Sequence, residues 1–152
     1  MATINAPYDA HMAGVPRQWT DTINPVAEGL IVGETPAVVT EDMTVAASQT
    51  IATPYVPVGF DTSGNLVPAL WDATYASAGV RAIGILLRPI TTPASPVQGQ
   101  PVLRQGCLNM DMIAWPASFD TEEKKLEAFR GAPTPSSIVV KKVRAGSIVA
   151  QP

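Results

Sequence analysis

The sequence predicts a mainly β fold with one short α-helix at about residues 120–130. Two observations lead to this prediction. The 152 residues include 15 prolines and 11 glycines, so few windows before residue 116 are long enough for an uninterrupted helix. The apolar residues instead form short runs bounded by turn-forming residues, a pattern typical of strands joined by turns. The length fits one domain, which buries a core without needing disulfides or a metal.

The first segment differs from the rest. Residues 1–26 mix Pro, Asn, Asp, Thr and small residues and show no sustained period of 2 or 3.6. They predict an extended N-terminal arm that is weakly ordered alone. A β-rich domain is expected over residues 27–140 and a C-terminal tail over residues 141–152. The large apolar residues of the arm would be useful only against a partner, and these are Ile4, Tyr8, Trp19 and Ile23.

The strand signals begin at Gly29. Strands are expected at 30–32, 37–40, 43–46, 55–60, 66–71, 81–87, 102–104, 107–114 and 137–140. Between them, Glu41–Asp42 is interpreted as a turn, and Asp61–Asn65 as a turn made by Asx and Gly chemistry. Gly106 is expected to form a turn or bulge. Residues 89–101 contain four prolines and are interpreted as an exposed loop.

One helix is well marked. Asp120 is a favourable N-cap, and Glu123 has the spacing of a capping box. Leu126 and Phe129 are expected to share one helix face because they are three residues apart. Gly131 then provides a C-terminal stop.

Composition and charge exclude several classes of partner. Hydrophobic residues make up 46% of the chain and charged residues 15%, so much of the surface is expected to be hidden in a core or against partners. The net charge is −3 and there is no basic stripe, which disfavours nucleic-acid binding. The longest apolar run, residues 82–87, is far too short to cross a bilayer, and no secretion signal is recognisable at the N-terminus. We therefore expect no nucleic-acid or membrane partner.

Catalytic chemistry has little support. His11 is the single histidine and Cys107 the single cysteine, so neither a histidine-based metal site nor an intrachain disulfide is expected. His11 is expected to be solvated, and Cys107 to be a small buried apolar residue on a strand. Asp61 and Asp72 are explained better by turns than by an acidic site. The usual phosphate, dinucleotide and nucleophile-elbow motifs are missing from the sequence, and we expect neither an enzyme nor a cofactor.

The three tryptophans can be interpreted as core residues or as contacts with a partner. Trp71 and Trp115 each end a strand-like run, and a place in the core or at a subunit interface fits both equally well. Trp19 in the arm fits a contact with a partner better than a place in the core.

Two stretches carry a resemblance to a known family. The first is Phe60–Asp72 followed by Ala82–Leu86, and the second combines Arg104–Cys107, Trp115-Pro116, Asp120–Gly131 and Ser137–Val139. They resemble the head decoration proteins of lambda-type tailed phages, which show a similar D-T-S turn, a V-G-I-L strand, a W-P pair and a helix ending in A-F-x-G. The resemblance covers roughly residues 45–140, and the spacing from Trp115 to Phe129 matches without a gap.

The resemblance implies a small fold of the β-clip type with one helix. It also implies a homotrimer on the local threefold axes of the capsid, added after shell expansion, with an arm that orders on the shell. We therefore expect a structural virion protein, made in the host cytoplasm and placed on the outer capsid surface, with the major capsid protein as partner. The expected capsid contacts are Ile4, Tyr8, Trp19 and Ile23, and the expected anchors of the trimer or core are Trp71, Trp115, Pro116 and Phe129.

The chain also departs from the family. Its N-terminal part is longer, a tail follows Val140, and the 89–101 loop is enlarged. The exposed Pro/Thr/Ser loop supports an alternative function, a virion-surface module that binds host glycans or the cell surface.

Overall fold

The computed structural model describes residues 29–73, 79–131 and 136–143. The predicted arm over residues 1–26 lies outside the described residues, and so does the predicted tail beyond residue 143. The domain boundaries therefore stay predictions.

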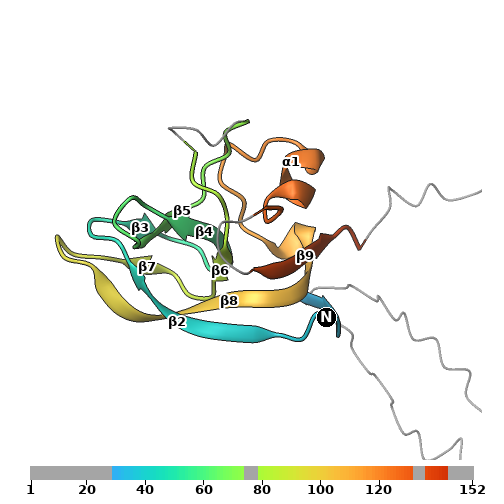
Figure 1. Cartoon of the computed structure of the whole chain (residues 1–152), viewed down its shortest axis with the longest axis horizontal. Coiled ribbons are helices and arrows are strands. Elements are labelled where there is room, and N and C mark those ends of the chain that lie inside the picture. The colour runs from blue at the N-terminus through green and yellow to red at the C-terminus, as the bar shows by residue number, and fades with distance from the viewer. Residues whose placement is uncertain (1–28, 74–78, 132–135, 144–152) are drawn as a thin grey trace, which may run out of the picture.

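Five strands close into a small barrel (Figure 1). They are β2 (Val39–Val45), β4 (Val56–Phe60), β5 (Leu66–Pro68), β6 (Gly84–Leu86) and β8 (Val97–Asn109). Around the barrel β8 pairs with β2, β2 with β5, β5 with β4, β4 with β6, and β6 again with β8. The pairings are antiparallel except for the parallel contact of Val45 with Leu66. The prediction of a mainly β fold with one short helix is confirmed.

The long strand β8 continues beyond the barrel and holds two more strands. β9 (Ser137–Lys141) runs parallel to the end of β8 on the edge that β6 also uses. β1 (Ile31–Gly33) runs antiparallel to the same end of β8 on the edge that β2 uses. The sequence suggested a turn or bulge at Gly106; the turn is not formed, because the strand passes through this residue, which has a φ of 152°. Glycine accepts that conformation because it has no Cβ.

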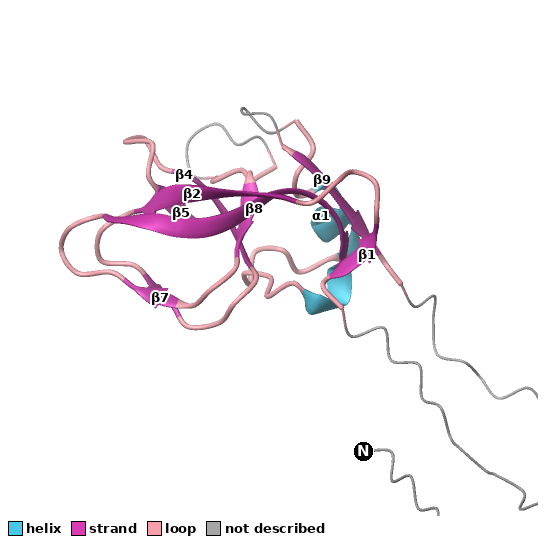
Figure 2. Ribbon diagram, turned by 90° about the horizontal axis from the view of Figure 1, so that it is seen from below, coloured by secondary structure: helices cyan, strands magenta, loops and turns pink. Residues whose placement is uncertain are grey.

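The smaller elements lie at the two ends of the molecule. β3 (Thr50–Ile51) and β7 (Ile90–Thr91) form a separate two-stranded sheet. A 3-10 helix, η2 (Met110–Met112), follows β8, and α1 (Glu122–Glu127) precedes β9. Figures 1 and 2 show β1, β9 and α1 together at one end and β7 at the other.

Alternation along the paired strands β6 and β8 separates two hydrophobic cores. Leu86 opposite Val102 faces the barrel core, whereas Ile85 opposite Leu103 faces the helix-side core. Successive residues of a strand point to opposite faces, which explains this division. The barrel core contains Val45, Ile51, Val56, Val58, Leu66, Ile83, Leu86 and Val102. The helix-side core contains Ala69, Ala82, Ile85, Leu103, Leu108, Met110, Ile113, Phe119, Ala128, Phe129, Ile138 and Val140.

Most of the predicted strands are present. Those expected at 30–32, 55–60, 66–71, 81–87 and 137–140 correspond to β1, β4, β5, β6 and β9. The turn at Asp61–Asn65 is also present, because the Asp61 Oδ1 accepts hydrogen bonds at 2.8 Å from the backbone N–H groups of Ser63 and Asn65. Gly64 adopts a φ of 80° in that turn.

The predicted turn at Glu41–Asp42 is wrong. Both residues lie inside β2, where Glu41 pairs with Val102 and Asp42 with Pro101. Residues 39–42 are all exposed, so the strand has no alternation of apolar and polar residues that the sequence could reveal.

The predicted exposed loop over residues 89–101 is also wrong in large part. β7 occupies Ile90–Thr91, and β8 begins at Val97. Thr92 is buried, and its Oγ1 donates to the Ala46 carbonyl at 2.7 Å and accepts from the Gln49 N–H at 2.7 Å. The exposed residues of the segment are Pro89, Thr91, the turn at residues 93–96, Gln98 and Gly99.

The helix begins one residue later than the capping-box spacing predicts. Thr121 is the N-cap, and its Oγ1 accepts from the Lys124 N–H at 3.4 Å. Asp120 instead pairs with the Lys124 ammonium. Gly131 has a φ of 62°, as expected after a helix end. Phe129 lies beyond the helix end at Glu127 and is buried, whereas Leu126 lies within the helix and is 41% exposed.

Candidate functional site

An aromatic cluster centred on Phe119 joins the segment after β5 to the segment before α1. Phe119 is 2% exposed. Its ring lies 5.9 Å from Trp71 in an edge-to-face arrangement and 5.4 Å from Trp115 in a tilted one. Aromatic pairs prefer such geometries because the ring edge is positive and the face negative. The cluster therefore fixes two irregular segments, one after β5 and one before α1, on the helix-side core.

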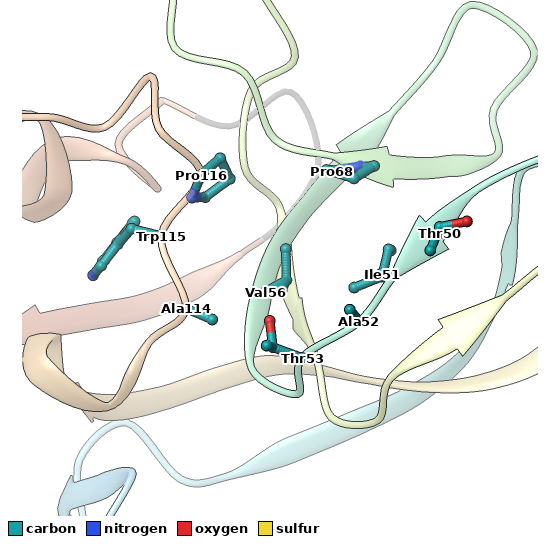
Figure 3. Close-up of a pocket in the computed structure, with 9 residues that line it drawn as sticks. All are labelled: Thr50, Ile51, Ala52, Thr53, Val56, Pro68, Ala114, Trp115 and Pro116. Atoms are coloured by element: carbon teal, nitrogen blue, oxygen red, sulfur yellow. The ribbon is translucent and has the colours of Figure 1, made fainter.

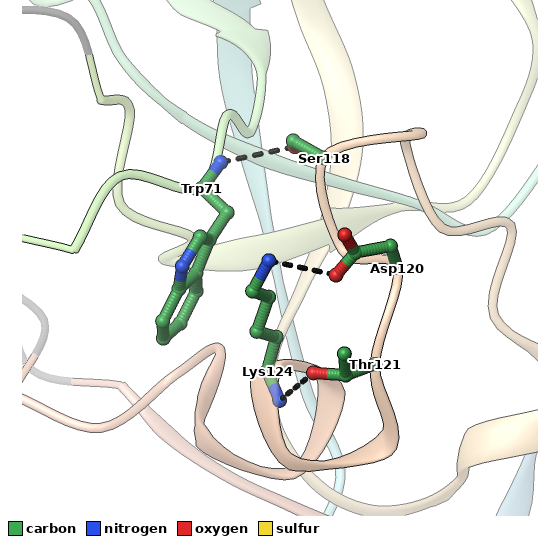
Figure 4. Close-up of polar contacts among 5 residues, drawn as sticks. All are labelled: Trp71, Ser118, Asp120, Thr121 and Lys124. Atoms are coloured by element: carbon green, nitrogen blue, oxygen red, sulfur yellow. Dashed lines mark hydrogen bonds and ion pairs between the residues drawn. The ribbon is translucent and has the colours of Figure 1, made fainter.

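Hydrogen bonds hold both tryptophans in place. The Trp115 Nε1–H donates to the Met110 carbonyl at 2.9 Å. The Trp71 backbone N–H donates to the Ser118 Oγ at 3.0 Å, as Figure 4 shows beside the start of the helix. Both side chains are partly buried and pack against the helix-side core. Both tryptophans thus pack against the core, whereas a contact with another subunit of a trimer stays a prediction.

The other two predicted anchors lie close to the same cluster. Phe129 is 6% exposed and belongs to the helix-side core. Pro116 is partly exposed, and its carbonyl accepts from the Phe119 N–H at 2.9 Å. The structure thus brings Trp115, Pro116 and Phe129 around one core, and each still has the trimer contact as an untested prediction.

A pocket of about 300 Å³ opens beside Trp115, on the side of the barrel (Figure 3). Its lining residues are Thr50, Ile51, Ala52, Thr53, Val56, Pro68, Ala114, Trp115 and Pro116. The Ala114 N–H donates to the Tyr55 carbonyl at 3.1 Å and ties the two walls together. Tyr55 has a φ of 64°, which is in the left-handed region that residues other than glycine rarely adopt. The lining described offers hydroxyls and apolar surface but no titratable group, so it carries no acid or base.

Ion pairs surround α1 (Figure 4). Lys124 lies 2.7 Å from Asp120 Oδ1, and its hydrogen bond and charge hold the pKa of that carboxyl below its usual value. Lys142, just after β9, lies 2.8 Å from Glu122 Oε2, and this hydrogen bond and charge raise the pKa of the ammonium. The second pair links the end of β9 to the start of the helix. All four side chains are exposed enough for water and salt to screen the interactions.

Several predicted residues lie outside the described residues. These are Ile4, Tyr8, Trp19 and Ile23, together with His11. Cys107 is described and is buried with a free thiol, as predicted. Within residues 29–73, 79–131 and 136–143, no group of three or more His, Cys, Asp or Glu residues is placed to hold a metal ion. The helices described there are too short and too polar to span a membrane.

Two residues that organise this region were not predicted from the sequence. Phe119 is the centre of the aromatic cluster, but it lies in an irregular segment without periodicity. Arg104 is 6% exposed although it is charged, and its Nε lies 3.4 Å from Glu41 Oε2 across β8 and β2. An arginine at the end of a predicted apolar strand is the signal that could have indicated this pair.

Residues 20–135 match the family model described as bacteriophage lambda head decoration protein D. A search of curated proteins found no match. The matched range contains the whole barrel and the aromatic cluster, but it begins after Trp19, and it ends before β9.

Proposed function

The chain belongs to the bacteriophage lambda head decoration protein D family, and from this premise we propose that it forms a homotrimer on the outer surface of the expanded capsid. Family membership makes it a structural protein of the phage capsid and not an enzyme. In our proposal the trimer sits at local threefold sites, contacts the major capsid protein and stabilises the shell. The match over residues 20–135 is the observation that carries this proposal.

Stabilisation would follow from mass action. A protein that binds the assembled shell and not its separated subunits shifts the equilibrium toward the shell. A threefold-symmetric trimer presents three identical contact surfaces to a threefold site. Binding through three linked contacts is stronger than binding through one, because the second and third contacts form within the same complex.

We propose that the N-terminal arm supplies much of each contact. An extended segment can add a strand to an exposed sheet edge of the capsid protein. Ordering it costs about 1–2 kcal/mol per residue, so backbone pairing and burial of large apolar side chains must offset that cost. The side chains proposed for this role are Ile4, Tyr8, Trp19 and Ile23.

The fold supports this assignment through the position of β1. β1 begins at Ile31 and pairs with the end of β8, where Ile31 lies opposite Leu108. The segment before β1 is thus tied to the end of the sheet that also carries β9 and α1 (Figure 1). Figure 1 places this end opposite β7.

Electron microscopy of expanded capsids mixed with the protein tests the proposal. We expect density at the local threefold sites of the outer surface, and a higher temperature of capsid disruption. Bare capsids at saturating protein would overturn the proposal. Deletion of residues 2–25 tests the arm separately: we expect lost binding from a chain that still folds, with deletion of residues 144–152 as the matched control. Undiminished binding without the arm would contradict its role.

The alternative of a glycan-binding module has less support than the sequence suggested. It depended on an exposed loop over residues 89–101, and β7 and β8 take up most of that segment. What remains is the exposed turn at residues 93–96. This turn alone does not favour glycan binding, and we do not propose it.

A further inference from the structure

β2 has an open edge. Along its whole length β2 pairs with β8, from Val39 opposite Gln105 to Val45 opposite Val97. On its other edge the described pairing is confined to Val45, which lies opposite Leu66 of β5. Residues 39–42 are exposed. Within the described residues, the stretch from Val39 to Met43 therefore has one edge without a strand partner, and alternate residues of such an edge direct their backbone N–H and C=O groups outward.

β9 has a second open edge on the other side of the sheet. Gln105 of β8 lies between Val39 of β2 and Ser137 of β9, so β2 and β9 occupy opposite edges of β8. β9 pairs with β8 through all five of its residues, and the part of the chain that the structure describes supplies no strand on its other edge. Figure 1 shows both strands at the margin of the sheet. One molecule thus carries two open edges that face in different directions.

The two edges carry opposite charge. β2 has Glu41 and Asp42 in its centre, both exposed. β9 ends in Lys141, which is exposed. Glu41 already forms an ion pair within the chain with Arg104, and Lys142, which follows β9, forms one with Glu122. The contrast between the two edges therefore rests on Asp42 and Lys141. Exposed valines accompany the charges, because Val39 is 38% exposed and Val139 is 43% exposed. Both edges therefore combine unpaired backbone, one sign of charge and an apolar side chain.

We infer that copies of this chain join head to tail, with the open edge of β2 in one copy paired parallel to the open edge of β9 in the next. The inference rests on the proposed homotrimer and specifies how its subunits meet. β2 against a second β2 would place carboxylates beside carboxylates, and β9 against a second β9 would place ammonium groups together, each of which is unfavourable across a strand pair. The β2–β9 pairing instead brings Asp42 of one copy beside Lys141 of the next.

Such a contact has the symmetry that a trimer needs. Two different surfaces of one chain meet, so the contact is heterologous, and a heterologous contact produces a closed ring when the rotation between copies closes. Backbone pairing supplies affinity, and the charges select the partner edge and the register. A ring also leaves neither edge exposed, which removes the aggregation risk of an open strand.

A charge swap tests the inference in the full chain. Asp42→Lys and Lys141→Asp each replace an attraction by a repulsion at every subunit contact, and each is expected to lower the association constant of the trimer by about tenfold or more. The double variant restores the attraction and is expected to recover most of that loss. Glu123→Lys reverses an exposed charge on α1 and serves as the control. Sedimentation velocity measures all four, and a double variant as weak as the single ones would overturn the inference.

Cross-linking gives a second readout that does not depend on charge. The variant with Asp42→Cys and Lys141→Cys is expected to form a covalent trimer on mild oxidation, in solution or on capsids. Either single variant alone is expected to give no such ladder, and the native Cys107 is buried and does not interfere.

The outcomes separate this inference from the proposed function. A wild-type chain that stays monomeric and leaves expanded capsids bare would overturn both. A chain that trimerises or decorates capsids, with neither cross-linking nor recovery in the charge swap, would leave the proposed function standing and refute the head-to-tail pairing.

Discussion

An ion pair joins Glu41 on β2 to Arg104 on β8, with Oε2 3.4 Å from Nε. The arginine side chain is 7% exposed and the glutamate side chain 54% exposed. The Arg104 stem also lies over Gly84 of β6, where an added Cβ would come within 3.4 Å of the Arg104 Cδ. One charged residue thus links three strands of the barrel.

Glu41→Gln is expected to lower the free energy of unfolding by about 1–2 kcal/mol, because it removes the charge that balances a buried guanidinium. The value is at the lower end for a buried pair because Glu41 itself is half exposed. Urea denaturation measures the change. Glu34→Gln removes an exposed carboxylate and is the control, with an expected change within about 0.5 kcal/mol. Equal effects of the two substitutions would show that the pair does not stabilise the barrel.

Phe119→Ala is expected to cost about 3–5 kcal/mol of stability, because it empties the centre of the aromatic cluster. Trp71 and Trp115 lose their ring contact with Phe119, so the native fluorescence spectrum is expected to shift to longer wavelength as well. Leu126→Ala is the control: it also shortens a large apolar side chain, but Leu126 is 41% exposed. Its cost is expected to stay below about 1 kcal/mol. A Phe119→Ala variant with wild-type stability would mean that the cluster does not hold these segments.

The elements that could be predicted are those whose boundaries are local. The turn at Asp61–Asn65 depends on the Asp61 carboxylate and on Gly64, both recognisable in the sequence. β9 alternates between exposed and buried residues, and Gly131 ends the helix segment. In each case the signal and the structure involve the same few neighbouring residues.

The features that escaped prediction depend on distant partners. The sequence predicted strands on both sides of Glu41–Asp42, and pairing with β8 makes this exposed and charged stretch part of one continuous strand, β2. Pro101 suggested a loop, yet it lies in β8, where its carbonyl accepts from the Leu87 N–H at 3.1 Å. A proline can still accept through its carbonyl, so it is tolerated where no backbone donor is needed.

The candidate site shows the same division. Trp71 and Trp115 stood out in the sequence because large aromatic residues are rarely left exposed, but the interpretation as core or interface stayed open. Their common partner Phe119 became visible only when the fold brought together segments 48 residues apart in the case of Trp71.

Gly59→Ala is expected to cost more than about 2 kcal/mol, because the added Cβ would lie 2.2 Å from the Arg81 carbonyl oxygen and 2.6 Å from Val80 Cγ1. β4 and the chain before β6 would have to separate. Gly99→Ala is the control. A Cβ added at Gly99 has no neighbour within 4 Å, so the alanine has only to adopt the φ of 70°. Its cost is expected to be about 1 kcal/mol. Thermal unfolding compares the two, and a smaller loss for Gly59→Ala than for Gly99→Ala would contradict the close approach.

Asp120 gives the stability a defined pH dependence. Lys124 lowers the pKa of its carboxyl from 3.8 in the folded chain, mainly through their hydrogen bond. A lowered folded pKa means that the contribution is present above pH 3.8 and is lost as the pH falls through the folded pKa. The stability difference between wild type and Asp120→Asn is therefore expected to be larger at neutral pH than at about pH 2.5. Added salt is expected to reduce it, because both side chains of the pair are accessible to solvent. Thermal unfolding at the two pH values measures the difference, and a carboxyl NMR titration of Asp120 with a midpoint at or above 3.8 would contradict the explanation.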